Sequence, residues 1–157
     1  MVGLPLISLL LRENASVNVY HSKTVNLKEK TSLADIVIVA SGCPLLIKED
    51  FVKEDAVVID VGINRVDGKL CGDCDFLSLY DKVSYITPVP GGVGPMTIAM
   101  LMHNVIKAAK GKIGIIDSII IKTHPSNGPH TPNIFINSSI KLLISLKNPV
   151  IIIRLLL

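Results

Sequence analysis

The stretch IVIVASGCP, residues 36–44, constrains the fold most: five aliphatic residues follow one another and end in a polar turn with glycine and proline. A second stretch of this kind, AVVIDVGIN, covers residues 56–64. Uninterrupted apolar runs of this length are typical of parallel strands that are buried on both faces of a sheet. The two stretches therefore predict parallel strands, each with a loop at its carboxyl end.

Segments with helical and with extended character alternate around these two runs. The predicted strands are Val17–Tyr20, Ile36–Ala40, Ala56–Val61 and Ser84–Thr87, and the predicted helices are Pro5–Glu13, Val25–Leu33 and Pro95 to about Lys110. The pair Asp67-Gly68 predicts a tight hairpin in the segment between the third and the fourth of these strands. This order predicts an α/β domain with a Rossmann-like, doubly wound and mostly parallel sheet over residues 1–112.

Composition and charge limit the class of protein. The 157 residues are 49% hydrophobic and 18% charged, which is enough for one domain with a core. The net charge of +3 comes from residues 113–157, with four basic residues and one acid, because the rest of the chain holds 12 of each. Residues 1–112 are thus neutral overall and contain no basic stripe, which argues against a nucleic-acid partner. The apolar segments Leu4–Leu11 and Val150–Leu157 are too short to span a bilayer, so no membrane association is expected.

Three cysteines, Cys43, Cys71 and Cys74, form a sparse and odd-numbered set, which is typical of a reducing compartment. A zinc site would need two further ligands beside the Cys71-x-x-Cys74 pair, and the sequence has no second pair. We therefore expect no metal site and interpret the pair as small residues near a turn. The expected location is the cytoplasm, with the mitochondrion as the alternative for a eukaryotic source, since no targeting segment is recognised.

Polar or glycine-rich loops follow all four predicted strands. These loops are His21–Thr24, Ser41–Pro44, Val61–Asn64 and Thr87–Pro95. Ligands of open α/β sheets bind outside the carboxyl ends of the strands, so the four loops predict a site along one edge. Gly42 and Gly62 would let the backbone approach a flat ligand there, although each could equally be a turn glycine.

The loop TPVPGGVGPMT, residues 87–97, holds three prolines and three glycines. Its amides precede a helix in which Pro95 suits the first position, and its prolines reduce the ordering entropy that is lost on binding. An awkward joint between two elements is the alternative reading. In the loop after Tyr20, the chain offers His21, Ser22, Lys23 and Thr24 where an NAD enzyme usually offers an acid, and these donors suit a 2′-phosphate.

The motifs also resemble those of a known family. The segments VGLPLISLLL, ASVNVYHSKT, ADIVIVASGCP, AVVIDVGINRVDGKLCGD and ITPVPGGVGPMTIAMLM resemble the methylenetetrahydrofolate dehydrogenase/cyclohydrolase family in order and spacing, from Val2 to about Lys112. Members of this family oxidise 5,10-methylenetetrahydrofolate with NADP or NAD and hydrolyse the methenyl product to 10-formyltetrahydrofolate. The resemblance implies NADP as cofactor with NAD as the alternative, tetrahydrofolate derivatives as substrates, and a homodimer as in the family.

The resemblance also implies roles for residues of the four loops. Ser22 would contact the 2′-phosphate side of the cofactor, and Ile63 would lie against the cofactor. Gly42, where the backbone could approach a flat ligand, completes the predicted cofactor-binding residues. The residues that would border the folate and the nicotinamide are Pro90, Gly91, Gly92, Val93 and Gly94. No catalytic residue is assigned, because the family's Tyr and Lys for cyclohydrolase proton transfer belong to an amino-terminal domain that this sequence lacks.

Two departures from the family pattern set further expectations. The family's first strand and its Gly-Arg-Ser turn would precede Val2, so we interpret the chain as a truncated copy of the cofactor domain whose activity is weak or absent, or as a non-catalytic dinucleotide-binding remnant.

Residues 113–157 contain thirteen isoleucines without a helical or alternating pattern and resemble no part of the family. Without its central strand we expect the domain to be marginally folded or aggregation-prone, unless this tail supplies a substitute. His124 and His130, in a loop-like part of the tail, are not expected to be ligands.

Overall fold

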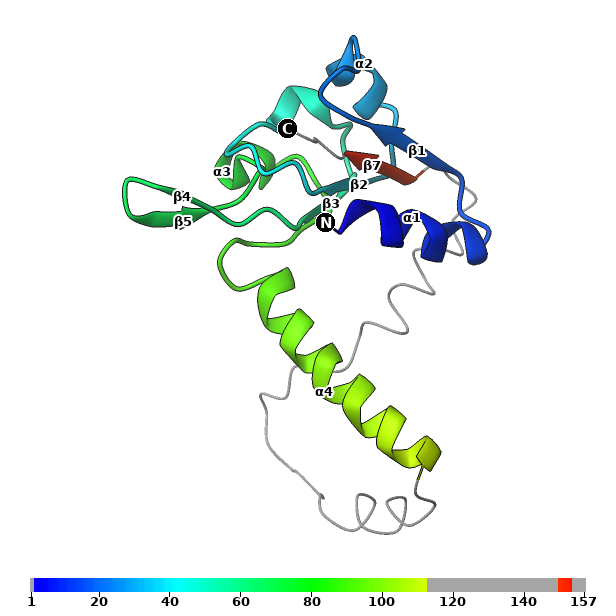
Figure 1. Cartoon of the computed structure of the whole chain (residues 1–157). Helices are drawn as coiled ribbons and strands as arrows, with labels where there is room; N and C mark the ends of the chain where they lie inside the picture. The colour runs from blue at the N-terminus through cyan, green and yellow to red at the C-terminus, as the bar shows by residue number, and fades with distance from the viewer. Residues whose placement is uncertain (1, 113–149, 154–157) are drawn as a thin grey trace.

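The computed structural model describes residues 2–112 and 150–153 (Figure 1). Its helices are α1 (Gly3–Arg12), α2 (Leu27–Thr31), α3 (Phe76–Leu79) and α4 (Val93–Lys112), with a short 3-10 helix η1 (Glu49–Phe51). Its strands are β1 (Val17–Tyr20), β2 (Ile36–Val39), β3 (Val57–Asp60), β4 (Asn64–Val66), β5 (Lys69–Cys71), β6 (Tyr85–Ile86) and β7 (Val150–Ile153). Residues 113–149, including His124 and His130, lie outside this description.

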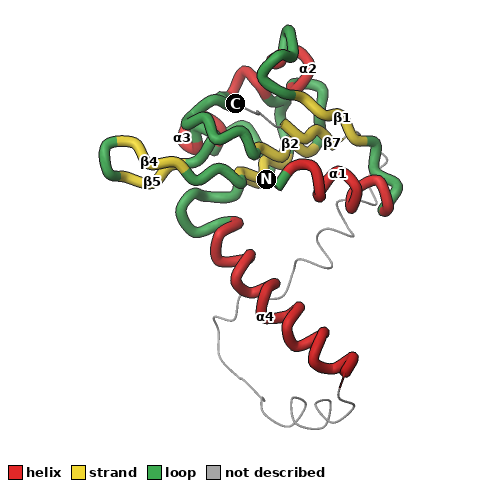
Figure 2. Tube along the Cα trace, viewed as in Figure 1, coloured by secondary structure: helices red, strands yellow, loops and turns green. Residues whose placement is uncertain are grey.

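A five-stranded sheet with the order β1-β7-β2-β3-β6 forms the centre of the domain. Every neighbouring pair in it is parallel, as the uninterrupted apolar runs predicted. Ile36 of β2 pairs with Val57 of β3, and Val57 in turn pairs with Tyr85 of β6. The predicted hairpin is β4–β5, an antiparallel pair around Asp67-Gly68 that extends from the sheet (Figure 2). The α/β fold class is therefore confirmed.

Strand β2 explains why the sheet is buried on both faces. Val37 and Val39 belong to one apolar cluster, which also contains Ile47, Val58 and Leu79. The alternate residues Ile36 and Ile38 belong to a second cluster with Leu10 of α1. Because successive side chains of a strand point to opposite faces, four aliphatic residues in a row require an apolar layer on each side.

The central place of the first strand, which the sequence predicts to be empty, is filled by β7 from the tail. In dinucleotide-binding sheets the first strand lies at the centre, between the second and the fourth. Here β1 and β2 hold those two neighbouring places, and β7 lies between them, parallel to both. The register could not be predicted because Val150–Ile153 consists of four β-branched residues, which carry no alternating pattern that would distinguish one alignment from the next.

Helix α4 begins at Val93, two residues before the predicted first position, Pro95. The first N–H groups of a helix have no partner within it, so a proline in the first turn removes no hydrogen bond. Val93 and Gly94 therefore belong to the helix and not to the preceding loop. Helix α4 projects away from the sheet (Figure 1). In the part of the chain that the structure describes, no helix is sufficiently long and apolar to cross a bilayer.

Candidate functional site

The four loops that follow β1, β2, β3 and β6 lie along one edge of the sheet, because these strands are parallel. Ser22 follows β1, Gly42 follows β2, Ile63 follows β3, and Pro88–Gly92 follows β6. This is the edge at which doubly wound sheets bind their ligands. The geometry of the backbone thus places the predicted site residues on a single side of the molecule.

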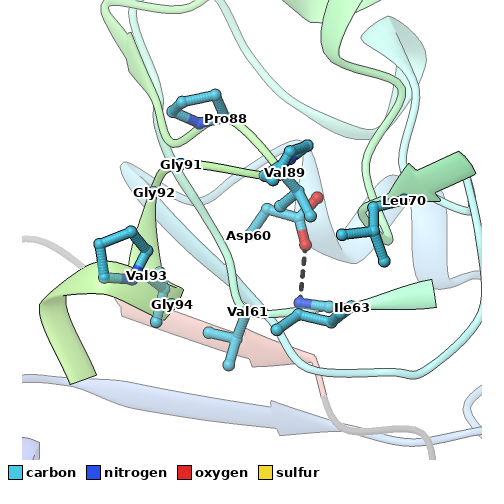
Figure 3. Close-up of a pocket in the computed structure, with 13 residues that line it drawn as sticks. Asp60, Val61, Ile63, Leu70, Pro88, Val89, Gly91, Gly92, Val93 and Gly94 are labelled. Carbon is cyan, nitrogen blue, oxygen red and sulfur yellow. Dashed lines mark hydrogen bonds between the residues drawn. The ribbon is translucent and has the colours of Figure 1, made fainter. Parts of the chain in front are cut away.

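A small cavity of about 90 Å³ lies between the loop after β3 and the loop after β6 (Figure 3). The residues that line it are Asp60, Val61, Gly62, Ile63, Leu70, Pro88, Val89, Pro90, Gly91, Gly92, Val93, Gly94 and Pro95. Complete ligand sites usually measure about 300–1,000 Å³, so this cavity fits one end of a ligand.

The cavity brings together six of the eight predicted site residues, which are Ile63, Pro90, Gly91, Gly92, Val93 and Gly94. Ser22 and Gly42 are not among its lining residues, since they belong to the loops farther along the edge. Ile63 is 67% exposed, so most of its side chain is open to a ligand at the rim. The structure therefore divides the predicted set into one compact group and two outlying positions.

The loop between β6 and α4 is fixed to the sheet through Thr87. The backbone N–H of Asp60 donates to Oγ1 of Thr87 at 2.8 Å, and the N–H of Thr87 donates to the carbonyl of Val58 at 3.1 Å. A Cβ on Gly92 would lie 2.5 Å from the carbonyl oxygen of Pro88, so this glycine is required by the loop's own fold. By contrast, nothing lies within 4 Å of a Cβ on Gly94. Gly94 thus has open space beside it, where a ligand would fit.

Two buried carboxylates connect the loops of the site. Asp60, at the end of β3, is 3% exposed and accepts hydrogen bonds from three backbone N–H groups: Gly62 at 2.8 Å, Asp73 at 3.1 Å and Cys74 at 2.8 Å. Its bond with Gly62 is visible in Figure 3. Asp60 therefore links the strand end to the segment that follows the β4–β5 hairpin.

Asp73 is fully buried and reaches the loop after the neighbouring strand, β2. Its Oδ2 accepts from the N–H of Ser41 at 2.6 Å and of Gly42 at 2.8 Å, while its Oδ1 accepts from Nδ2 of Asn64 at 2.7 Å. Charge-assisted bonds of this kind are about twice as strong as neutral ones. Together, Asp60 and Asp73 hold three segments of the site edge in fixed relative positions.

These carboxylates change the interpretation of Gly62. From the sequence, Gly62 was a position where the backbone could approach a ligand. In the structure, the carboxylate and the backbone nitrogen of Asp73 fill the space that a Cβ on Gly62 would need. Asp60 fills the corresponding space at Gly72. Both glycines are thus explained by close packing against buried acids.

Sequence reasoning did not single out Asp60, Asp73, Asn64 or Leu70 as site residues. A signal was present: Asp60 is the one charged residue of an otherwise apolar strand, and each acid lies next to or near a glycine in the chain. A carboxylate that ends a buried strand must find backbone donors, because an unpaired buried charge is very costly. The pairing with donors from another loop could not be deduced without the fold.

The charge state of Asp60 follows from its surroundings. Burial raises the pKa of its carboxyl above the ordinary value, although its three backbone hydrogen bonds act in the opposite direction, and the nearby Asp73 raises it further. Asp60 is the titratable residue among those that line the described cavity, and its oxygens face backbone amides. The cavity is therefore suited to positioning ligands more than to proton transfer.

The turn after β1 presents two exposed donors. The N–H of His21 donates to Oγ1 of Thr24 at 3.0 Å, the N–H of Thr24 donates back to the carbonyl of His21 at 2.8 Å, and the N–H of Lys23 donates to Nδ1 of His21 at 3.1 Å. His21 and Thr24 thus close the turn, while Ser22 and Lys23 are exposed at its tip. This arrangement suits an anion that approaches from solvent.

The two cysteines of the Cys71-x-x-Cys74 pair differ in burial, because Cys74 is buried and Cys71 is half-buried. Burial, together with the charge of Asp60, raises the pKa of the Cys74 thiol, so Cys74 remains protonated within the apolar core. Within residues 2–112 and 150–153, no cluster of three or more His, Cys, Asp or Glu side chains is placed to hold a metal ion. Cys74 therefore acts as a small core residue.

The sheet order, the loops at its carboxyl edge and the glycine-rich entry to α4 define a dinucleotide-binding type of α/β domain. The model of the NAD(P)-binding domain of tetrahydrofolate dehydrogenase/cyclohydrolase matches residues 1–113. The chain therefore belongs to the tetrahydrofolate dehydrogenase/cyclohydrolase family, through this domain.

Curated relatives agree with this assignment. The chain is 60% identical over 111 residues to the bifunctional protein FolD of Bacillus anthracis, an alignment that covers 70% of this chain and 39% of the relative. The same identity and coverage are found with the bifunctional protein FolD of Bacillus thuringiensis. The chain thus spans about two fifths of the length of these relatives.

Solved structures lead to the same family. The bifunctional enzyme FolD of Campylobacter jejuni matches with 54% identity and a TM-score of 0.69, over 71% of this chain and 40% of that one. The FolD of Trypanosoma brucei, solved in complex with NADP cofactor and an inhibitor, matches with 41% identity and a TM-score of 0.61, over 66% and 38% of the two chains. At these identities and scores, both solved structures support the fold and the family of this chain.

Proposed function

We propose that this chain binds NADP along the carboxyl edge of its sheet and represents the cofactor domain of a methylenetetrahydrofolate dehydrogenase/cyclohydrolase. The observation that carries the proposal is the family match over residues 1–113 combined with the grouping of Ile63 and Pro90–Gly94 around one cavity. In the complete family enzyme, the reaction is the oxidation of 5,10-methylenetetrahydrofolate to the methenyl form, followed by hydrolysis to 10-formyltetrahydrofolate.

The residues of the edge fit such a cofactor. Open space beside Gly94 and the exposed side chain of Ile63 leave room for a flat ring at the cavity. The exposed donors Ser22 and Lys23 suit a phosphate at the far end of the edge. NADP, when bound, supplies the hydride acceptor, its nicotinamide ring. NAD is the alternative cofactor, and the absence of an acid in the turn after β1 favours NADP.

The protein's part in the reaction would be to hold two ligands in contact. Pro90, Gly91 and Gly92 would support the folate and the nicotinamide, and the Asp60–Asp73 network would keep the loop after β3 in place beside them. Orientation of this kind accelerates a transfer between two bound molecules without an acid or base from the protein. No residue of this chain is assigned to the cyclohydrolase step.

A second function is a dinucleotide-binding remnant, or a fragment that acts with a separate amino-terminal partner, without turnover of its own. The observation in its favour is coverage: the chain aligns with only 39% of the Bacillus anthracis relative. For either function, we also propose a homodimer, as in the family, and a cytoplasmic location. The free cysteines of the described residues support a reducing compartment.

One experiment separates the two functions. The purified chain is titrated with NADP and then assayed for NADPH formation from 5,10-methylenetetrahydrofolate. We expect NADP binding with weak or absent turnover, and a rise in turnover when the amino-terminal part of the Bacillus anthracis FolD is added. Clear turnover by the chain alone would exclude the remnant. Absence of NADP binding in a folded sample would contradict the proposed function altogether.

A further inference from the structure

We propose that the position between β1 and β2 is a strand-acceptor site that binds an aliphatic strand parallel to both neighbours, and that Val150–Ile153 is its intramolecular occupant. Every residue of β7 pairs on both sides. Val150 pairs with Val17 and Ile36 at one end, and Ile153 pairs with Tyr20 and Val39 at the other. The occupant thus joins β1 to the rest of the sheet.

The two neighbouring strands define the backbone chemistry of this site. In a parallel ladder, each strand uses its N–H and C=O groups on the side that faces its neighbour. Without an occupant, β1 and β2 would each present a row of unpaired groups toward a gap, which is the arrangement that recruits strands from other chains. Among the strands that the structure describes, β7 is the neighbour with which β1 pairs, so the backbone pairing of β1 depends on the occupant.

The apolar clusters on the two faces of β2 determine which side chains the strand-acceptor site can hold. Ile36 and Ile38 of the adjacent strand lie in the cluster that contains Leu10 of α1, and Val37 and Val39 lie in the cluster on the opposite face. Helix α1 also lies beside β7 (Figure 1). Because both faces of the adjacent β2 are covered by apolar clusters, we expect a strand in this position to be apolar at consecutive positions. A segment with alternating charges would be excluded.

The occupant's composition agrees with this requirement, and its attachment makes it exchangeable. Val150–Ile153 consists of β-branched aliphatic residues, which favour strands. β7 is short and is connected to α4 only through residues 113–149. Its binding is therefore favoured by the covalent connection, and a separate polypeptide binds in its place by mass action. The partner that this site fits is a segment of four or more consecutive valine or isoleucine residues.

Hydrogen exchange on the complete chain tests whether β7 occupies the site. We expect the amides of Val150–Ile153 and of β1 to exchange at least about 100-fold more slowly than in an unstructured peptide. Ile151→Pro removes a donor and does not fit a central strand, so we expect protection to be lost in β1 as well. The control Ile151→Val keeps a β-branched residue and should retain it. Exchange at Val150–Ile153 as fast as in the unstructured peptide would overturn the proposal.

A peptide added in trans tests whether the site accepts a second polypeptide. The probe is the segment NPVIIIRLLL, residues 148–157, with a lysine tag for solubility, added to the Ile151→Pro chain. We expect it to restore slow exchange in β1 and β2, whereas the same peptide with Ile151→Pro should not. If the peptide fails to restore protection in a folded Ile151→Pro variant, the proposal that a second polypeptide can replace β7 is overturned. Should the variant not fold, the isotope-labelled probe peptide is mixed with a high excess of the wild-type chain. Absence of any protection of the peptide amides would then overturn the exchange too.

Discussion

Asp73 fills the space that a side chain on Gly62 would occupy, and its backbone nitrogen would lie 2.7 Å from a Cβ atom there. The same carboxylate accepts hydrogen bonds from Ser41, Gly42 and Asn64. One buried acid thus determines both the residue type at position 62 and the relative placement of two loops. The close packing at this edge therefore fixes the relative positions of the loops that form the candidate site.

Gly62→Ala should destabilise the protein. The added methyl group would meet Asp73, a buried residue that is held by three hydrogen bonds, and overpacking of this kind costs about 1–3 kcal/mol. The measurement is the free energy of unfolding in urea. Gly94→Ala is the matched control, because nothing lies within 4 Å of its Cβ, and it should change that free energy by less than about 0.5 kcal/mol. Equal effects of the two substitutions would refute the packing argument.

Asp73→Asn should also reduce stability, by removing charge rather than by adding volume. An asparagine has one acceptor oxygen where the carboxylate has two, so its NH2 group must face either the N–H groups of Ser41 and Gly42 or the amide of Asn64, and the bonds that remain lose their charge. An unsatisfied buried group costs about 1–3 kcal/mol. Asp81→Asn, at an exposed acid, serves as the control, and its urea unfolding midpoint should equal that of the wild type. Wild-type stability of Asp73→Asn would mean that the network carries no energy.

The raised pKa of Asp60 predicts a pH dependence of defined sign. The folded state binds this proton more readily than the unfolded state, so the free energy of unfolding falls as pH rises from the ordinary value of 3.8 through the folded pKa. Above that pKa, the contribution stays constant at its lower level. The lowered pKa of Asp50, caused first by its hydrogen bond with Lys28, acts in the opposite direction.

Comparison with Asp60→Asn isolates the effect of this one group. The difference in unfolding free energy between wild type and variant is measured across the acidic to neutral range. It should favour the wild type most at low pH and decline by at most about 1.4 kcal/mol per pH unit. A difference that grows with pH would contradict a raised pKa at Asp60. The exposed Asp81→Asn variant again provides the control for the loss of one charge.

The elements that sequence predicts well here are those whose pattern is fixed by burial. Ile36–Val39 and Val57–Asp60 are strands because uninterrupted aliphatic runs need cover on both faces, and that cover exists. Glycines and prolines after each strand mark the loops of the site edge. The loop that holds Pro90–Gly92 could be located in this way since its composition does not suit a helix or a strand.

What sequence did not predict depends on contacts between distant segments. The Asp60–Cys74 and Asp73–Ser41 hydrogen bonds join residues from different loops, and their existence follows from the sheet order. The register of β7 likewise depends on β1 and β2, because Val150–Ile153 has no internal alternation. The sequence leaves Gly62 open between ligand approach and a turn, because a short-range pattern cannot distinguish either role from close packing against a buried carboxylate.

Ser22→Asp should reverse the cofactor preference of the chain. Ser22 is exposed at the tip of the turn that His21 and Thr24 close, and the proposed function assigns it to the 2′-phosphate side of the cofactor. A carboxylate there would repel that phosphate and accept a hydrogen bond from the 2′-hydroxyl of NAD. We expect NADP affinity to fall about tenfold or more, corresponding to about 1.4 kcal/mol, while NAD affinity stays equal or rises.

Ser16→Asp adds the same charge at the opposite end of β1, at an exposed position, and should leave both affinities unchanged. The measurement is titration of each variant with NADP and with NAD. A parallel loss of both cofactors in Ser22→Asp would mean that the turn is structural, and selection of the 2′-phosphate would then have to lie elsewhere along the edge.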